Sequence, residues 1–294
     1  MLITLKNKQL KLIVSTYGAE ICSLKDIETG KDIIWNGNPA IWKYHAPILF
    51  PHCGKIKDGY VLIDGNRYPL KSNGFVRNLE HKVIKQAENS VVFELNENEY
   101  TLERFPYKFC MNVSYELVDN HINFLTTVKN TDKKSFSFSL GSHSAFKIDN
   151  KTPYQIEFEK REPLTKVVCL ENGFLASDNN KGCPYTEPYG ETDNGIIPIS
   201  SEGFGNGHLF TEIKSDWVGL RNLTTNELVQ VNTKSFPYVM IWQNKGEPEF
   251  VCIEPWYGMP DADNTDHNWN NKPGLIELLP GKEFTSNQSI CFLK

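Results

Sequence analysis

Residues 112–128, NVSYELVDNHINFLTTV, decide the fold class because two alternating runs flank a single break. Apolar side chains recur at every second position of each run, which is the period of a strand with one buried face. Asp119-Asn120 interrupts the alternation with residues that favour tight turns. The stretch predicts a β-hairpin, and the chain beyond it leads through 130–134 into the alternating run 135–140. We expect these runs to form one antiparallel meander.

The same period of two recurs along the chain. Residues 60–70 predict a hairpin that turns at Asp64-Gly65, and residues 238–256 predict another that turns within 244–248. Further short strands fit the segments 9–16, 90–95, 154–159, 217–222, 228–232 and 289–294. No stretch of a dozen residues carries a sustained helical pattern. The sequence predicts a mainly β protein with two large antiparallel sheets packed face to face, and with long loops at 171–210 and 255–275 over one concave surface.

Length and charge limit the class of protein. A chain of 294 residues is long enough for one large β domain, so we expect a single domain over 1–294. A formal net charge of −5, without a cluster of Lys and Arg, argues against nucleic acid or an anionic membrane as partner and favours a small neutral ligand. The first residues contain no apolar signal-peptide region, and the expected location is cytoplasmic.

The seven cysteines are scattered without any C-x-x-C pair, and most lie in apolar, strand-like segments. A disulfide framework usually has an even number of cysteines, and a zinc site usually has ligands closer in sequence. We therefore interpret the cysteines as reduced packing residues and expect no metal.

Glu254 is the most unusual acidic residue of the chain. In FVCIEPWYG, residues 250–258, alternation places Glu254 on the same strand face as Phe250, Cys252 and Trp256. A carboxylate among apolar side chains costs several kcal/mol unless it is paired or faces a wet cavity. Two interpretations are open: a structural ion pair, or a catalytic or ligand-binding group.

His143 ends the alternating run in LGSHSAF, residues 140–146. Continued alternation places its ring on the polar side of the strand, with Ser137 and Ser139 and away from Phe138. A single histidine is more often a satisfied core or surface residue than a catalyst, so both interpretations stay open for His143 alone.

Two further stretches, 46–60 and 71–78, contribute amide, guanidinium, imidazole and ammonium groups near predicted turns: Asn73, Arg77, His52 and Lys55. Planar groups with several donors bind hydroxyl-rich ligands, and an aromatic ring such as Trp42 or Trp256 packs against the C–H face of a sugar.

Together these stretches resemble the aldose 1-epimerase (galactose mutarotase) superfamily, and within it the bacterial galactose mutarotase-like branch. The resemblance covers nearly the whole chain and is carried by the blocks PILFPHCGKI, NGFVR, FPYKF, GSHSAF, IWQNKGEPEFVCIEPWYG and NKPGLIELLPGKEF.

The resemblance implies a large β-sandwich of the galactose mutarotase type, or supersandwich, without metal or organic cofactor. We expect a monomer or homodimer. The resemblance also implies an isomerase of carbohydrate metabolism that binds a monosaccharide and interconverts its α and β anomers. Glu254 then corresponds to the general base and His143 to the general acid, and we expect them to face each other across one pyranose ring. Arg77, Lys55 and Trp256 would contact the sugar.

Two positions depart from the family pattern. Asn73 stands where the family usually has histidine before Gly-Phe; its amide can bind a sugar oxygen but cannot transfer a proton. In FGNGHLF, residues 204–210, His208 lies where relatives often carry an acidic residue, so it is either a substitute sugar contact or a loop histidine without a role. The departures leave open which sugar is bound, and whether activity is weakened.

Three alternatives remain. The chain could bind a carbohydrate with little or no turnover. A glycoside hydrolase would need two carboxyl groups about 5 to 9.5 Å apart across a cleft. A sugar-phosphate mutarotase would need several basic side chains around the phosphate, for which Arg77 and Lys55 are the candidates.

Overall fold

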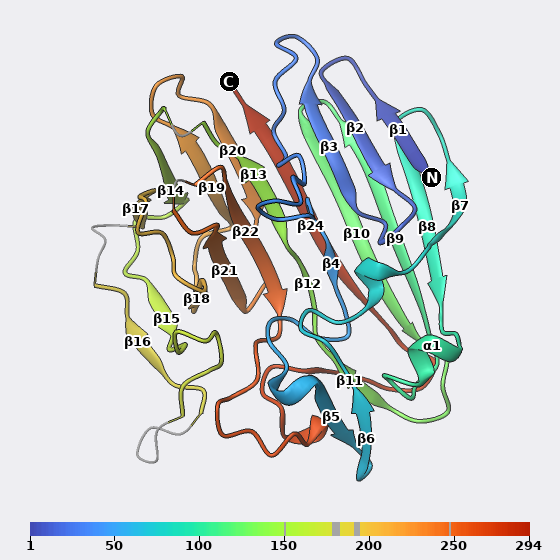
Figure 1. Ribbon diagram of the computed structural model, residues 1–294. Coiled ribbons are helices and arrows are strands. Elements are labelled where there is room, and N and C mark those ends of the chain that lie inside the picture. Colours follow the sequence, from blue (N-terminus) through green and yellow to red (C-terminus); the bar gives the residue numbers. More distant parts are fainter. Residues whose placement is uncertain (150, 178–182, 191–194, 247) are drawn as a thin grey trace.

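Figure 1 shows a computed structural model of the protein, which describes residues 1–149, 151–177, 183–190, 195–246 and 248–294. One antiparallel sheet has nine strands in the order β17 (Ile196–Pro198), β14 (Tyr154–Phe158), β19 (Trp217–Asn222), β20 (Leu228–Asn232), β24 (Glu283–Leu293), β10 (His121–Asn130), β9 (Phe109–Val118), β8 (Ser90–Asn96) and β7 (Lys82–Gln86). A second has eight strands: β16 (Thr186–Pro188), β15 (Thr165–Val167), β18 (His208–Thr211), β21 (Tyr238–Gln243), β22 (Phe250–Tyr257), β12 (Leu140–Ser142) and β4 (Ile48–Leu49), with β13 (Ser144–Lys147) also paired to β22.

Smaller elements complete the fold. Three short sheets consist of β1 (Leu2–Lys6), β2 (Leu10–Ser15) and β3 (Ile21–Asp26); β5 (Tyr60–Ile63) and β6 (Asn66–Pro69); and β11 (Phe136–Phe138) and β23 (Ile276–Leu278). Helical structure among the described residues is limited to α1 (Glu99–Leu102) and the 3-10 turns Lys57–Gly59, Val76–Asn78 and Trp269–Asn271. The predicted mainly β class is confirmed. None of the helices is long and apolar enough to cross a membrane, as judged over the described part of the chain.

All three predicted hairpins are present. β9 and β10 pair with Val118 opposite His121, and Asp119 adopts the positive φ of a tight turn at 50°. β5 and β6 pair around Asp64 and Gly65, with φ of 50° and 77°. β21 pairs with β22 over the whole length of β21. The remaining predicted strands correspond to β2, β8, β14, β19, β20 and β24.

The meander prediction is wrong beyond residue 130. The free edge of β10 pairs with the C-terminal strand β24 instead of with residues 135–140. Residues 136–138 pair with β23, and β12 pairs with β4 and β22 in the other large sheet. Local alternation cannot identify a partner that lies more than 150 residues away, because strand pairing is settled by tertiary packing. The predicted loop 171–210 likewise contains β16 and β17, with residues 178–182 and 191–194 lying outside the described residues.

The main core lies between the two large sheets. Four alternating side chains of β21 and β22 belong to one cluster of buried hydrophobic residues that also includes residues of β9 and β10: Val239, Ile241, Val251 and Ile253. Because successive side chains of a strand point to opposite faces, the intervening residues of β21 and β22 face away from this core. The second face of the eight-stranded sheet is thus free to build a site.

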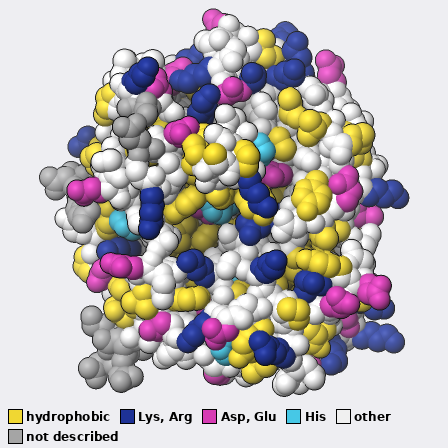
Figure 2. Space-filling view, viewed as in Figure 1, with side chains coloured by type: hydrophobic (Ala, Val, Ile, Leu, Met, Phe, Trp, Pro, Cys, Tyr) yellow, Lys and Arg dark blue, Asp and Glu magenta, His cyan; other side chains and the backbone are white. Residues whose placement is uncertain are grey.

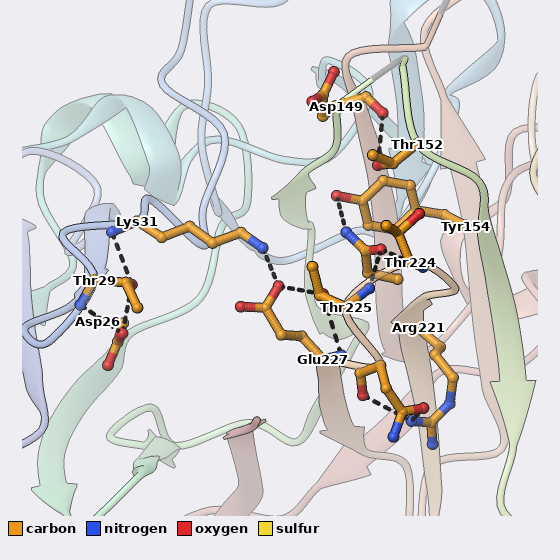
Figure 3. A network of polar contacts seen from close by, with 12 residues as sticks. Asp26, Thr29, Lys31, Asp149, Thr152, Tyr154, Arg221, Thr224, Thr225 and Glu227 are labelled. Carbon is orange, nitrogen blue, oxygen red and sulfur yellow. Dashed lines mark hydrogen bonds and ion pairs between the residues drawn. The ribbon is translucent and has the colours of Figure 1, made fainter.

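The N-terminal sheet packs beside the β7–β10 end of the nine-stranded sheet (Figure 1). The Tyr115 hydroxyl of β9 donates to the carbonyl of Ala19 at 2.7 Å. At the other side, the Lys31 ammonium pairs with the Glu227 carboxylate in the β19–β20 connection, and the Thr225 hydroxyl donates to the same carboxylate at 2.8 Å (Figure 3). These contacts attach residues 1–32 to the large sheet.

Candidate active site

A cavity of about 220 Å³ opens on the face of the eight-stranded sheet that turns away from the core. Hydrophobic and histidine side chains gather at the centre of this face, with Lys and Arg side chains around them (Figure 2). The lining residues are Gly54, Lys55, Ser72, Asn73, His143, Gly173, Asn206, Met240, Trp242, Glu254, Trp256 and Pro260. Pockets for drug-sized ligands span about 300 to 1,000 Å³, so the cavity has the size for a smaller molecule such as a monosaccharide.

The floor of the cavity comes from the predicted hairpin of β21 and β22. Met240 lies directly opposite Glu254, and Trp242 lies opposite Cys252. Alternation therefore turns Met240, Trp242, Glu254 and Trp256 to the same face, as the sequence predicted for the β22 residues. This hairpin gives the site a rigid base of two hydrogen-bonded strands.

His143 enters the cavity from the junction of β12 and β13. Its backbone N–H donates to the carbonyl of Pro47 at 3.0 Å. Its ring stacks on Trp42, with ring centroids 4.7 Å apart and planes at 28°, and meets Trp242 edge to face at 5.7 Å. The imidazole is thus fixed by its backbone and by two aromatic rings.

The imidazole of His143 and the carboxyl group of Glu254 lie side by side. Nδ1 of His143 is 3.3 Å from Oε1 of Glu254, and the two residues are 9% and 0% exposed. Among the described residues, neither carboxylate oxygen of Glu254 nor Nδ1 of His143 has a hydrogen-bond partner. Buried polar groups nearly always have partners, so this pair is available to a ligand. The two groups are too close for a sugar ring to lie between them.

Burial shifts both groups toward their neutral forms. It raises the pKa of Glu254 well above its usual range, and the neighbouring Trp256 indole opposes this to a smaller extent. Burial also lowers the pKa of His143 to about 3, aided by repulsion from the Arg77 guanidinium. Burial thus favours the neutral forms of both groups, and moving one proton from Glu254 to His143 would leave the total protonation of the pair unchanged.

Asn73 is held by the backbone that follows β4. Asn73 and Gly74 have positive φ of 63° and 67°, and a Cβ on Gly74 would lie 1.9 Å from the carbonyl oxygen of Phe50, so only glycine fits there. The side-chain oxygen of Asn73 accepts the N–H of Gly54 at 2.7 Å, and its backbone N–H donates to the Gly54 carbonyl at 2.8 Å. Because the side-chain oxygen is occupied, its amide N–H groups are the ones that remain for a ligand.

Lys55 forms one side of the cavity. Its ammonium donates to the carbonyl of Asn172 at 2.6 Å, next to Gly173 in the lining. The backbone carbonyl of Lys55 accepts the N–H of Asp261 at 2.9 Å, which brings the neighbouring Pro260 into the lining as well. The buried carboxylate of Asp261 pairs with the buried ammonium of Lys272. Three distant loops therefore meet around Lys55.

Two predicted sugar contacts, Arg77 and His208, are not among the lining residues of the cavity within the described chain. Arg77 donates to the carbonyl of Ser72 at 3.1 Å and lies over the ring of Tyr44, with its guanidinium carbon 4.6 Å from the ring centroid. The ring of His208 lies 5.3 Å from that of Phe204. Sugar contact by Arg77 and by His208 stays a prediction, and Arg77 supports the lining residue Ser72.

Sequence reasoning missed Trp242, Met240 and Asn206 as lining residues. The signal for the first two was present, because the predicted hairpin sets both on the face of Glu254. The sequence also suggested Trp42 as a ring that packs against the C–H face of the sugar. In the structure, the ring of Trp42 stacks on His143. Asn206 lies two residues before His208 in a loop whose placement no local pattern indicates.

Two groups of side chains could hold a metal ion, as judged over the described residues: His143, Cys252 and Glu254, and separately Glu20, Cys22 and His45. In each group the ligand atoms lie within 4.8 Å of one another. In the second group Oε1 of Glu20 already accepts the backbone N–H groups of His45 and Ala46, at 2.6 and 3.0 Å. That carboxylate has a structural role.

A larger hollow of about 430 Å³ lies beside the C-terminus. The ammonium group of Lys294, which lines this hollow, forms ion pairs with the carboxylates of Asp26 and Glu28, so these three charged groups satisfy one another. The 220 Å³ cavity, with its unpartnered acid and imidazole, is the better candidate for chemistry.

Galactose mutarotase-like proteins of known structure share the architecture of this chain. The chain belongs to the aldose 1-epimerase family, whose model matches residues 1–291. A galactose mutarotase related enzyme from Lactobacillus acidophilus is 30% identical, with a TM-score of 0.92 over 100% of this chain and 98% of that one. A galactose mutarotase-like protein from Lactobacillus casei is 25% identical, with a TM-score of 0.92 over 100% of both chains.

A relative known from its sequence, the plasmid-encoded protein LacX of Lactococcus lactis, is 27% identical over 292 residues, which cover 95% of each chain. These findings confirm the predicted superfamily and the predicted fold type. Membership in this family supports a role in sugar binding or epimerisation.

Proposed function

We propose that the protein interconverts the α and β anomers of a free hexose or a related monosaccharide, with Glu254 as general base and His143 as general acid. The observation that carries the proposal is the unpartnered pair, 3.3 Å apart, at the floor of a monosaccharide-sized cavity. The C1 hydroxyl oxygen and the ring oxygen are bonded to the same carbon. Adjacent acid and base groups can therefore reach both oxygens from one side of the sugar.

Ring opening uses the form of the pair in which Glu254 is ionised and His143 is protonated. Glu254 removes the proton of the C1 hydroxyl while His143 protonates the ring oxygen, so the bond between C1 and the ring oxygen breaks and an aldehyde forms. Rotation about C1–C2 and the reverse proton transfers close the ring as the other anomer. Each cycle returns both protons, so the pair needs no exchange with solvent. Such positioned acid–base groups typically contribute about 10²- to 10⁴-fold each.

The other lining groups supply binding. The amide N–H groups of Asn73 and the ammonium of Lys55 can donate to sugar hydroxyls, and the rings of Trp242 and Trp256 can pack on C–H faces. Glu254 is the only carboxyl group among the described lining residues, which argues against a glycoside hydrolase with paired carboxyl groups.

The test is the rate of anomer exchange, measured by NMR across a panel of aldoses. The wild-type protein should accelerate exchange of at least one sugar, and Glu254→Gln and His143→Ala should remove most of the acceleration. Equal rates for the three proteins would refute the proposal.

A second candidate function is carbohydrate binding with little turnover, favoured by Asn73, which cannot transfer a proton, at a position where a supporting histidine is usual. It requires saturable sugar binding without faster anomer exchange in the wild type. In that case Asn73→His should raise the exchange rate while sugar affinity stays similar.

A further inference from the structure

The acid–base pair has a third potential metal ligand beside it. Cys252 lies two residues before Glu254 on β22, on the same strand face, and its sulfur lies within 4.8 Å of both the imidazole nitrogen and the carboxylate. All three side chains are buried. The spacing of the cysteines in the sequence argued against a zinc site. Sequence spacing does not reveal that His143, more than a hundred residues earlier in the chain, lies next to Cys252 in the fold.

The distances suit a tetrahedral ion. Zinc bonds to nitrogen and oxygen of about 2.0 to 2.2 Å give a ligand-to-ligand edge of roughly 3.3 to 3.5 Å in a tetrahedron. The observed separation of Nδ1 of His143 and Oε1 of Glu254 is 3.3 Å. A bond to sulfur of about 2.3 Å gives an edge of roughly 3.6 Å. Because the sulfur lies within 4.8 Å of the other two ligand atoms, it would have to move by about 1.2 Å at most.

We propose that His143, Cys252 and Glu254 form a site for one thiophilic divalent cation such as Zn²⁺, which enters through the sugar cavity and takes its fourth ligand from water. His143 and Glu254 both line the cavity, so an ion has a route to them. Both carboxylate oxygens of Glu254 and Nδ1 of His143 lack other partners among the described residues. These free lone pairs point to a ligand that the protein itself does not supply.

Binding of the ion displaces protons to solvent. Cys252 loses its thiol proton and Glu254 its carboxyl proton, while neutral His143 coordinates through Nδ1 as it is. Two anionic ligands then balance the two positive charges of the ion, which compensates for placing the ion in a buried site. The thiolate makes the site selective for zinc-like ions over Mg²⁺ and Ca²⁺, which prefer oxygen ligands.

The other potential ligand group provides a matched control. Cys22 and His45 lie beside Glu20, but Oε1 of Glu20 is already engaged by two backbone N–H groups. Cys22→Ser therefore removes a cysteine from a similar trio without altering the proposed site.

The experiment is a titration of the reduced protein with CoCl₂, followed by the thiolate-to-cobalt charge-transfer absorption, and with ZnCl₂, followed by calorimetry. Wild type and Cys22→Ser should each bind one ion with the thiolate band. Cys252→Ser should lose the band and bind zinc at least about tenfold more weakly. X-ray absorption of zinc-loaded wild type should show one sulfur ligand with nitrogen and oxygen ligands, which tests the site without any variant.

The proposal fails if wild type binds no ion saturably, if the band persists in Cys252→Ser, if it disappears in Cys22→Ser, or if zinc has no sulfur ligand. One consequence rests on the proposed function: zinc occupies the acid–base pair and should inhibit anomer exchange competitively with the sugar. A protein without exchange activity would refute the proposed function alone, because the cobalt titration is read independently of any sugar.

Discussion

Two buried glutamates of this protein, Glu162 and Glu254, differ in the hydrogen-bond partners of their carboxyl groups. Glu162 is 6% exposed, and its carboxylate accepts the backbone N–H of Lys214 at 2.9 Å and both the N–H and the hydroxyl of Ser215, at 2.9 and 2.6 Å. Glu254 is 0% exposed, and its oxygens have no hydrogen-bond partner among the described residues. Burial alone therefore does not distinguish a structural carboxylate from a candidate catalytic one.

The difference lies in the surroundings. Glu162 is held by a loop whose N–H groups converge on it, so its charge stabilises the local backbone. Glu254 lies near the thiols of Cys252 and Cys53, whose pKa values are raised by burial and, to a smaller extent, by Glu254, and it faces a cavity. A carboxyl group without partners at the floor of a cavity lowers the stability of the fold, and a ligand can supply the missing contacts.

The largest expected effect is the loss of activity in Glu254→Gln. The amide has the shape of the carboxyl group but cannot accept the proton of the C1 hydroxyl, so anomer exchange should fall by about 10²- to 10⁴-fold. The free energy of unfolding should stay the same or rise, because no ion pair of the fold is broken. NMR exchange rates and urea unfolding measure the two quantities, with the exposed Glu116→Gln as control. A variant that keeps its activity but unfolds more easily would assign Glu254 a structural role.

The pH dependence of stability should differ between wild type and Glu254→Gln. The pKa of Glu254 is raised in the folded protein, so its contribution to stability is full below an unfolded pKa of about 4.3 and is lost as pH rises through the folded value. Glu254→Gln has no ionisable group at this position, so its stability does not fall with pH for this reason. Urea unfolding should therefore show the variant gaining stability over wild type as the pH rises above about 4.3.

The stability contribution of His143 has the opposite pH dependence, and it is present in both wild type and Glu254→Gln. Its pKa is lowered to about 3, so its contribution is present above an unfolded pKa of about 6.5 and is lost as pH falls toward 3. Acid destabilisation should thus occur in wild type and in Glu254→Gln alike. A stability difference that does not change with pH would contradict the raised pKa of Glu254.

Glu20 is an intermediate case, a partnered carboxylate that reaches the site indirectly. It holds the N–H groups of His45 and Ala46, and the adjacent carbonyls of His45 and Pro47 accept the N–H groups of Ala145 and His143. We predict that Glu20→Ala lowers kcat by about tenfold with little change in KM, and costs about 1 to 3 kcal/mol of stability. Because an amide oxygen can still accept both N–H groups, Glu20→Gln should restore most of kcat. Failure of this rescue would separate Glu20 from the positioning of His143.

Much of the fold could be predicted from alternation and turn residues, because hairpins are local. The hairpins at Asp64-Gly65 and Asp119-Asn120 follow directly from residues that tolerate positive φ. The pairing of β10 with β24 could not be predicted in this way, since it joins segments more than 150 residues apart. Such pairings depend on which hydrophobic faces pack together in the whole molecule.

In the candidate site, too, the residues placed by local strand alternation could be predicted, and those placed by long-range contacts could not. Glu254 and Trp256 were found because they share a strand face, and Trp242 could have been found from the same hairpin. Asn206 and Pro260 could not, because their loops are placed by tertiary contacts such as the hydrogen bond from Leu175 N–H to the Asp261 carbonyl. The contact of His143 with Glu254 also depends on which strands lie beside β22.

The smallest expected effect on activity is that of Glu162→Gln, which tests the structural side of the comparison. The amide oxygen can still accept from Ser215, but the amide NH2 group would then face the N–H of Lys214, so the free energy of unfolding should fall by about 1 to 3 kcal/mol. Anomer exchange by the folded protein should be unchanged, because Glu162 does not line the cavity. Urea unfolding and NMR exchange at a temperature well below the transition measure the two effects. If Glu162→Gln slowed exchange as Glu254→Gln is expected to, hydrogen-bond satisfaction would not separate the two roles.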